Sequence, residues 1–209
     1  MKLTAIDPNL DLAKSYSGVE RAKGVHMSDL YNSFYERKEP KRYAKRTGDK
    51  PLELFELGMA LEEMLEERLI LAEGSQRPEP LITGEGIHYS PDLIIMNHVD
   101  PFRLGEIKLT FMSTKGAVWK IGQTTPGLDP KFDKYFTQMK CYCKHLGTRF
   151  ARLYVFFVNE AAPWGNQKGA LRCWDIEFTQ HEIDEEWDII WRHAKSEGLL
   201  KGLKRQGRS

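Results

Sequence analysis

The strongest constraint on the fold is a pair of short apolar runs, PDLIIM and FRLGEIKL, which flank the turn-rich segment NHVDP within residues 91–109. Such an arrangement predicts a β-hairpin. If the turn is centred on Val99, positions equally far from it pair, so Asp92 faces Glu106 and Lys108 lies on the same face. Apolar residues occupy most of both faces, a pattern typical of a central strand pair that is covered on both sides.

Asp92 and Glu106 cannot share one face of a buried hairpin without a neutralising partner. Carboxylates directly opposite each other lie about 5 Å apart and repel, and burying either one unpaired is strongly unfavourable. A divalent cation such as Mg²⁺ would neutralise both and keep positions for water and phosphate. Alternatively, Lys108 forms a salt bridge with Glu106 while Asp92 caps a strand. The hairpin alone supports the two interpretations equally.

The composition indicates one globular domain. A chain of 209 residues, 41% hydrophobic and 29% charged, suffices for one full core, and its net charge of +1 gives no global polyanion signature. No apolar run has the length of a membrane span or of a signal segment, so a cytoplasmic location is expected. The three cysteines are too few and too irregularly spaced for a disulfide framework or a four-thiolate metal site.

Two amphipathic helices are predicted, one before and one after the hairpin. Residues 51–72 have leucines at helical spacing, and Glu62 lies at the margin of that apolar stripe. A Glu-rich helix usually has only a solvated acidic face, but the position of Glu62 fits the edge of a buried site. Residues 131–146 form the second helix, in which Gln138 and Tyr142 are one turn apart on one flank and can reach one place.

The remaining elements complete an α/β domain. Ser28 is predicted to cap a short helix that ends near Lys38. Residues 81–89 are predicted to be a strand that extends the hairpin to a three-stranded meander. A second hairpin is predicted within 149–178, and Thr179 opens a last helix. The predicted organisation is an irregular N-terminal arm at 1–27, one domain at 28–198 and a basic tail at 199–209.

Two segments combine cations with aromatic rings, which suits nucleic acid because phosphates contact the cations and bases stack on the rings. One is the basic stretch ERKEPKRYAKR at 36–46, and the other is the long segment 111–130 beyond the charged face of the hairpin. A solvated basic face and a core position for the tryptophan are the alternatives. The candidate nucleic-acid contacts are Arg42, Lys115, Trp119 and Lys120.

The order helix, three strands, helix, strand, with charges on the second and third strands, resembles the core of the PD-(D/E)XK nuclease superfamily. Within it the chain looks like the RecB-like exonuclease branch, whose members are often encoded by phages. The resemblance covers roughly residues 28–160. It implies a single α/β domain with a restriction-endonuclease-like αβββαβ core, in which helices flank a central mixed β-sheet. The residues that carry the match are Pro91 with Asp92, Glu106 to Lys108, Gly58 with Glu62 (GxxxE) and Gln138 with Tyr142 (QxxxY).

The resemblance also implies a metal site. Asp92, Glu106 and the backbone carbonyl of Ile107 would bind Mg²⁺ or Mn²⁺, and Glu62 would complete the shell directly or through water. Many RecB-like nucleases have His where this chain has Glu62, which leaves the composition of the shell open. The iron–sulfur cysteines of one sub-branch are missing, so no cluster is expected.

By the same resemblance, Lys108 would orient or activate the attacking water, while Gln138 and Tyr142 would position Lys108 or the DNA backbone. The implied function is a metal-dependent deoxyribonuclease, most simply an exonuclease of recombination or repair that acts on linear duplex or single-stranded DNA. No helicase motif is present, so unwinding would come from a recombinase or helicase partner. The alternatives are an endonuclease that nicks or cuts branched DNA, and a non-catalytic DNA-binding scaffold.

Overall fold

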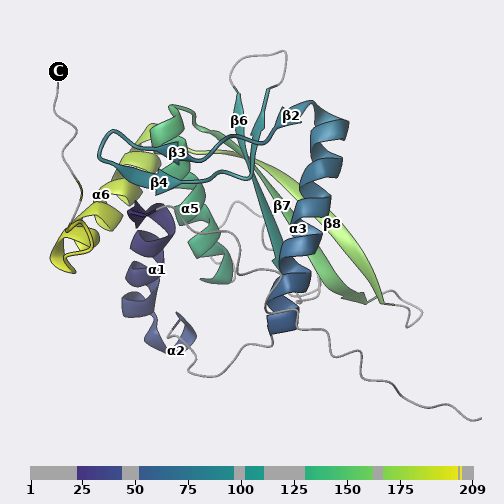
Figure 1. Cartoon of the computed structure of the whole chain (residues 1–209), viewed down its shortest axis with the longest axis horizontal. Coiled ribbons are helices and arrows are strands. Elements are labelled where there is room, and N and C mark those ends of the chain that lie inside the picture. Colours follow the sequence, from purple (N-terminus) through teal and green to yellow (C-terminus); the bar gives the residue numbers. More distant parts are fainter. Residues whose placement is uncertain are drawn as a thin grey trace, which may run out of the picture.

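The computed structural model describes residues 23–43, 52–96, 102–110, 130–161, 167–201 and 203. They form an α/β architecture in which a central mixed sheet has helices on both faces (Figure 1). The helices are α1 (Met27–Lys38), α2 (Pro40–Tyr43), α3 (Leu52–Glu73), α5 (Pro130–Leu146) and α6 (Gln180–Ser196). The strands are β1 (Val25–His26), β2 (Ser75–Gln76), β3 (Leu81–Ile82), β4 (Ile87–Tyr89), β5 (Leu93–Ile95), β6 (Arg103–Thr110), β7 (Phe150–Ala161) and β8 (Gln167–Glu177).

The central sheet has the strand order β2-β5-β6-β7-β8, with β6 and β7 parallel and the other pairs antiparallel. Leu93 pairs with Gly105 and Ile95 with Arg103, so the predicted register about Val99 is confirmed. Glycine is required at 105, because a Cβ there would lie only 2.8 Å from the Leu93 Cβ. The second hairpin is also confirmed as the antiparallel pair β7–β8.

The predicted first strand of the meander is wrong. The strand that pairs with β5 is β2, immediately after α3, and not the segment 81–89. Gly74, at a positive φ of 63°, turns the chain directly from α3 into β2. Residues 81–89 instead turn back at Gly86 and form β3 and β4, which join β1 in a separate three-stranded sheet. The order helix, three strands, helix, strand is therefore α3, β2, β5, β6, α5, β7.

Two apolar clusters lie on opposite faces of the central sheet. Successive residues of a strand point to opposite faces, so Leu104 and Ile107 of β6 enter different clusters. The larger cluster joins the sheet to α1, α5, α6 and β4, and the smaller one joins it to α3 (Figure 1). The prediction of a strand pair covered on both faces is confirmed. None of the helices in the described part of the chain is both long enough and apolar enough to cross a bilayer.

Two helix starts test the capping predictions. Thr179 does cap α6, since its hydroxyl accepts the Glu182 N–H and Glu182 in return accepts the Thr179 N–H at 2.7 Å. The N-cap of α1 is His26 and not Ser28, because pairing of β1 with β4 keeps His26 extended and the helix begins directly after it. Residues 25–26 thus form a strand within the predicted irregular arm. At the other end, Leu199, Leu200 and Leu203 of the predicted tail pack against the larger cluster.

Candidate active site

Lys108 lies between the two hairpin acids. Its ammonium contacts the Glu106 carboxylate directly and is 3.9 Å from Asp92 Oδ2. Asp92 Oδ2 also accepts a hydrogen bond from the Ile107 N–H at 2.7 Å, which fixes the aspartate across the β5–β6 ladder. Glu106 is fully buried because β6 is an interior strand with α5 packed on this face. Asp92, Glu106 and Lys108 thus lie together, as the two-residue period of the strands predicted.

Burial and mutual repulsion control the charges of these residues. Burial and then the neighbouring Asp92 raise the pKa of Glu106 above its ordinary value, although Lys108 opposes the rise. Burial by itself lowers the pKa of Lys108, but Glu106, Asp92 and Glu62 together raise it above its ordinary value. The ammonium is thus held in its charged form, and the surrounding carboxylates outnumber it.

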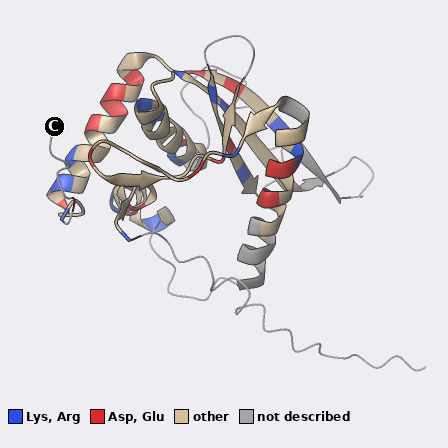
Figure 2. Cartoon of the chain, turned by 45° about the horizontal axis from the view of Figure 1, so that its top comes forward, with Lys and Arg blue, Asp and Glu red and all other residues tan. Residues whose placement is uncertain are grey.

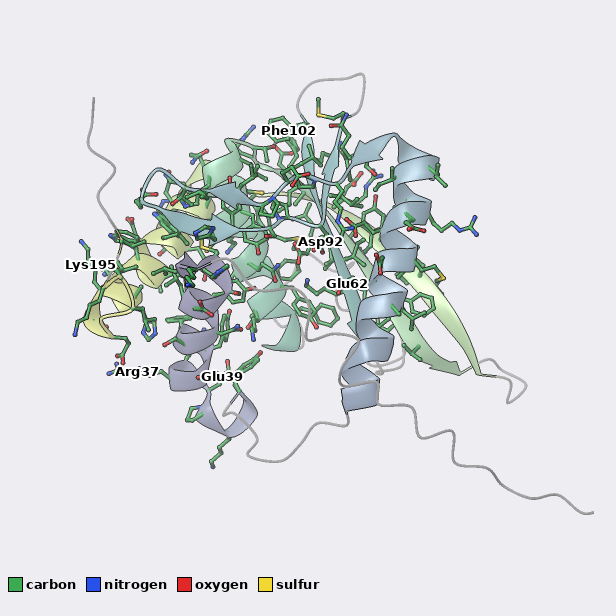
Figure 3. All side chains as sticks on the ribbon, viewed as in Figure 1. Arg37, Glu39, Glu62, Asp92, Phe102 and Lys195 are labelled. Carbon is green, nitrogen blue, oxygen red and sulfur yellow. The ribbon has the colours of Figure 1, made fainter. Side chains whose placement is uncertain are left out.

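Glu62 approaches the same charges from α3. Burial, followed by repulsion from Asp92, raises the pKa of Glu62 to about 6. Figure 3 shows Glu62 and Asp92 as neighbours at the centre of the molecule. Within the described residues, however, no three His, Cys, Asp or Glu side chains converge closely enough to form a ready metal cluster. The set Glu62, Asp92 and Glu106 is therefore not preassembled as a three-carboxylate shell.

Gln138 and Tyr142 extend from α5 toward Glu106. The Gln138 amide donates a hydrogen bond to Glu106 Oε1, the same oxygen that Lys108 contacts. Tyr142 is hydrogen-bonded to Gln138, and burial raises the pKa of its phenol. Both side chains are buried. Gln138 thus restrains the acid that Lys108 contacts. That Gln138 and Tyr142 position Lys108 or the DNA backbone stays a prediction.

One oxygen of Glu106 stands apart from these contacts. Glu106 Oε2 is buried and, among the described atoms, has no hydrogen-bond partner. A buried carboxylate oxygen without a partner is costly, and such exceptions in native structures are explained by strain, a functional role, an ordered water or a bound ion. Carboxylate and carbonyl oxygens are the donors that Mg²⁺ and Mn²⁺ prefer, so Asp92, Glu106 and the Ile107 carbonyl fit an ion of this kind.

Two tyrosines that the sequence reasoning did not single out also interact with the charge of Lys108. The Tyr135 ring centroid is 5.7 Å from Lys108 Nζ, within the range of a cation–π contact. Tyr135 is three residues before Gln138 on α5, so helical spacing was a signal that could have found it. Tyr31 of α1 is buried close enough to be influenced by the charges of Lys108 and Glu106. Nothing in the sequence around Tyr31 indicated this.

A cleft of about 600 Å³ opens beside Asp92. One wall is the acidic side of α3, visible as red bands in Figure 2. The opposite wall is the proline-rich segment after β2, together with the residues that lead into β5. The lining residues are Glu62, Glu63, Glu66, Arg77, Pro78, Glu79, Pro80, Ser90, Pro91 and Asp92. Glu66 was missed by the sequence reasoning, although it lies one helical turn after Glu62.

The four predicted nucleic-acid contacts stay predictions. Arg42 belongs to α2, a short helix within the basic stretch 36–46, but its side chain is outside the described set. Lys115, Trp119 and Lys120 all lie outside the described residues.

The comparison with solved structures matched SSO0001 and an alkaline exonuclease. No family model and no curated protein matches the chain. The structure resembles SSO0001 with a TM-score of 0.49 and 17% identity over 92% of this chain and 84% of that one. It also resembles the alkaline exonuclease LHK-Exo from Laribacter hongkongensis, with a TM-score of 0.46 and 18% identity over 89% and 87% of the two chains. The structure of LHK-Exo in complex with dAMP matches with a TM-score of 0.46 and 17% identity, over 87% of this chain and 92% of that one. Similarity at this level assigns no function to the chain.

Proposed function

We propose that this chain is a metal-dependent deoxyribonuclease, and most simply an exonuclease. The observation that carries the proposal is the buried Oε2 of Glu106, beside Asp92 and the Lys108 ammonium, for which the described residues supply no hydrogen-bond partner. A fold that needed only a salt bridge would gain nothing from additional acids around one lysine, since burying unpaired carboxylates is unfavourable. A site for phosphodiester hydrolysis needs these groups, because it holds a divalent cation and a phosphate together.

Asp92, Glu106 and the Ile107 carbonyl would hold Mg²⁺ or Mn²⁺, with Glu62 reaching it directly or through water. When bound, such a cation polarises the scissile phosphate and lowers the pKa of a coordinated water. Lys108 would donate hydrogen bonds to the attacking water or to the phosphate oxygens, on which negative charge builds during the reaction. Gln138, held by Tyr142, would keep the Glu106 carboxylate oriented.

The first experiment is a nuclease assay with linear duplex, single-stranded and closed circular DNA, each with Mg²⁺, Mn²⁺ or EDTA. The expected result is digestion of linear DNA that requires the metal, with closed circles left intact and products that carry 5′-phosphates. Cutting of closed circles would instead establish an endonuclease on the same site. No digestion of any substrate, together with DNA binding that Glu106→Gln leaves unchanged, would favour the non-catalytic scaffold.

Lys108→Ala is the decisive variant, with Lys195→Ala as its control. Lys195 is an exposed lysine of α6 whose ammonium lies over the Trp191 ring, away from the cleft. Lys108→Ala should lower kcat by at least about a hundredfold, the range of a positioned acid–base or electrostatic group, while Lys195→Ala stays near wild type. Wild-type turnover in Lys108→Ala would remove Lys108 from the mechanism.

A further inference from the structure

Arg77 is the one cation among the described residues that line the cleft beside Asp92. It follows β2, and its Nε lies 3.0 Å from Glu66 Oε1. The two partners differ in exposure, since the Arg77 side chain is 64% exposed and that of Glu66 only 8%. Glu66 thus anchors one edge of the guanidinium at the wall of the cleft while most of the arginine faces solvent.

The rest of the lining is poorly suited to a polyanion. Five of its members are acids and three are prolines, which have no backbone N–H to donate. Phosphate groups that enter this cleft would be repelled unless cations met them. A metal ion at Asp92 would meet one phosphate, and among the described lining residues Arg77 is the cation able to meet another.

We propose that Arg77 binds a backbone phosphate of the DNA strand that occupies this cleft, and that Glu66 positions the guanidinium for this contact. The inference rests on the proposed nuclease function and specifies how its substrate is held. A guanidinium has several N–H donors in a planar fork, so the ion pair through Nε leaves the terminal nitrogens to form charge-assisted bonds with phosphate oxygens. Arg77 therefore has a binding role and not a role in bond cleavage.

A purely structural role is the competing explanation. Glu66 is buried, and burial raises the pKa of its carboxyl even though Arg77 opposes the rise. If Arg77 only compensated the Glu66 charge, Arg77→Ala would destabilise the fold, and the double variant Arg77→Ala/Glu66→Gln would restore wild-type behaviour in every respect. If Arg77 binds phosphate, the double variant recovers stability without recovering DNA affinity.

The test measures the affinity of the full chain for a fluorescein-labelled single-stranded oligonucleotide by anisotropy, in Ca²⁺ so that binding is recorded separately from cleavage. Arg77→Ala and the double variant should each weaken binding by about tenfold, the loss expected for one charge-assisted contact. The slope of log affinity against log salt should fall by about 0.7, the value for one phosphate contact on a single strand. Arg77→Lys should recover part of the affinity.

Arg68→Ala is the matched control, because Arg68 is an exposed arginine of α3 that does not line the cleft. It should leave both affinity and salt slope unchanged. Wild-type affinity in Arg77→Ala, or in the double variant, would overturn the inference, as would an equal loss in Arg68→Ala. A wild type that cleaves DNA with Mn²⁺ while Arg77→Ala binds normally refutes only the role of Arg77. A wild type that neither binds nor cleaves DNA refutes the proposed function as well.

Discussion

Divalent cations should stabilise this protein through Glu106. Asp92, Glu106 and Glu62 all act electrostatically on one cation, Lys108, so the group carries two excess negative charges when all three acids are ionised. A dication would balance this excess and would also supply a partner for Glu106 Oε2. The experiment adds Mn²⁺ or Mg²⁺ to the metal-free chain and then removes the ion with EDTA.

The size of the effect follows from linkage. An ion that binds only the folded state, present at about 100 times its Kd, raises the free energy of unfolding by about 2.7 kcal/mol. For a chain of this length each kcal/mol shifts Tm by about 2–4 °C, so the expected rise is about 5–10 °C. Thermal unfolding followed by circular dichroism or a dye measures it, and EDTA should reverse it.

Variants locate the effect at the hairpin. Glu106→Gln and Asp92→Asn should each lose most of the metal-dependent rise, because each removes a carboxylate oxygen that would bind the ion. Glu185→Gln, on the solvent side of α6, should keep the full rise. No rise at saturating metal in the wild type, or the same rise in Glu106→Gln as in the wild type, would refute the assignment of this site to a divalent cation.

Three further predictions concern the fold that supports the site. Gly105→Ala should destabilise the protein by about 1–3 kcal/mol, since its Cβ would meet Leu93 at 2.8 Å, and chemical denaturation would detect this. Thr179→Ala should lower the stability by about 1 kcal/mol through loss of the α6 cap shared with Glu182, and an unchanged Tm would contradict this. Asp175→Asn should destabilise the protein at neutral pH, because hydrogen bonds from Arg152 lower the Asp175 pKa in the folded state. That stabilisation is present above the unfolded value of 3.8 and is lost as pH falls through the folded pKa, so urea midpoints of wild type and variant should converge in acid.

The site's central charges could be predicted from the sequence because their geometry is local. A turn centred on Val99 and the two-residue period of a strand suffice to place Asp92 opposite Glu106 and to add Lys108 to the same face. Helical periodicity likewise predicted α3 with Glu62 at its margin, and α5 with Gln138 and Tyr142 on one flank. These inferences need only the spacing of neighbouring residues.

The partners of those charges depended on contacts between segments distant in sequence. Because β2 pairs with β5, residues 81–89 belong to a second sheet instead. No local sequence pattern shows which of these two segments pairs with β5. Packing of α1 brought Tyr31 within the electrostatic influence of Lys108, and the segment after β2 brought Arg77 onto Glu66. Local sequence determined which residues share a face, through the fixed periods of strand and helix. What that face meets depends on the tertiary structure, because burial, desolvation and the approach of opposite charges arise when distant segments pack together.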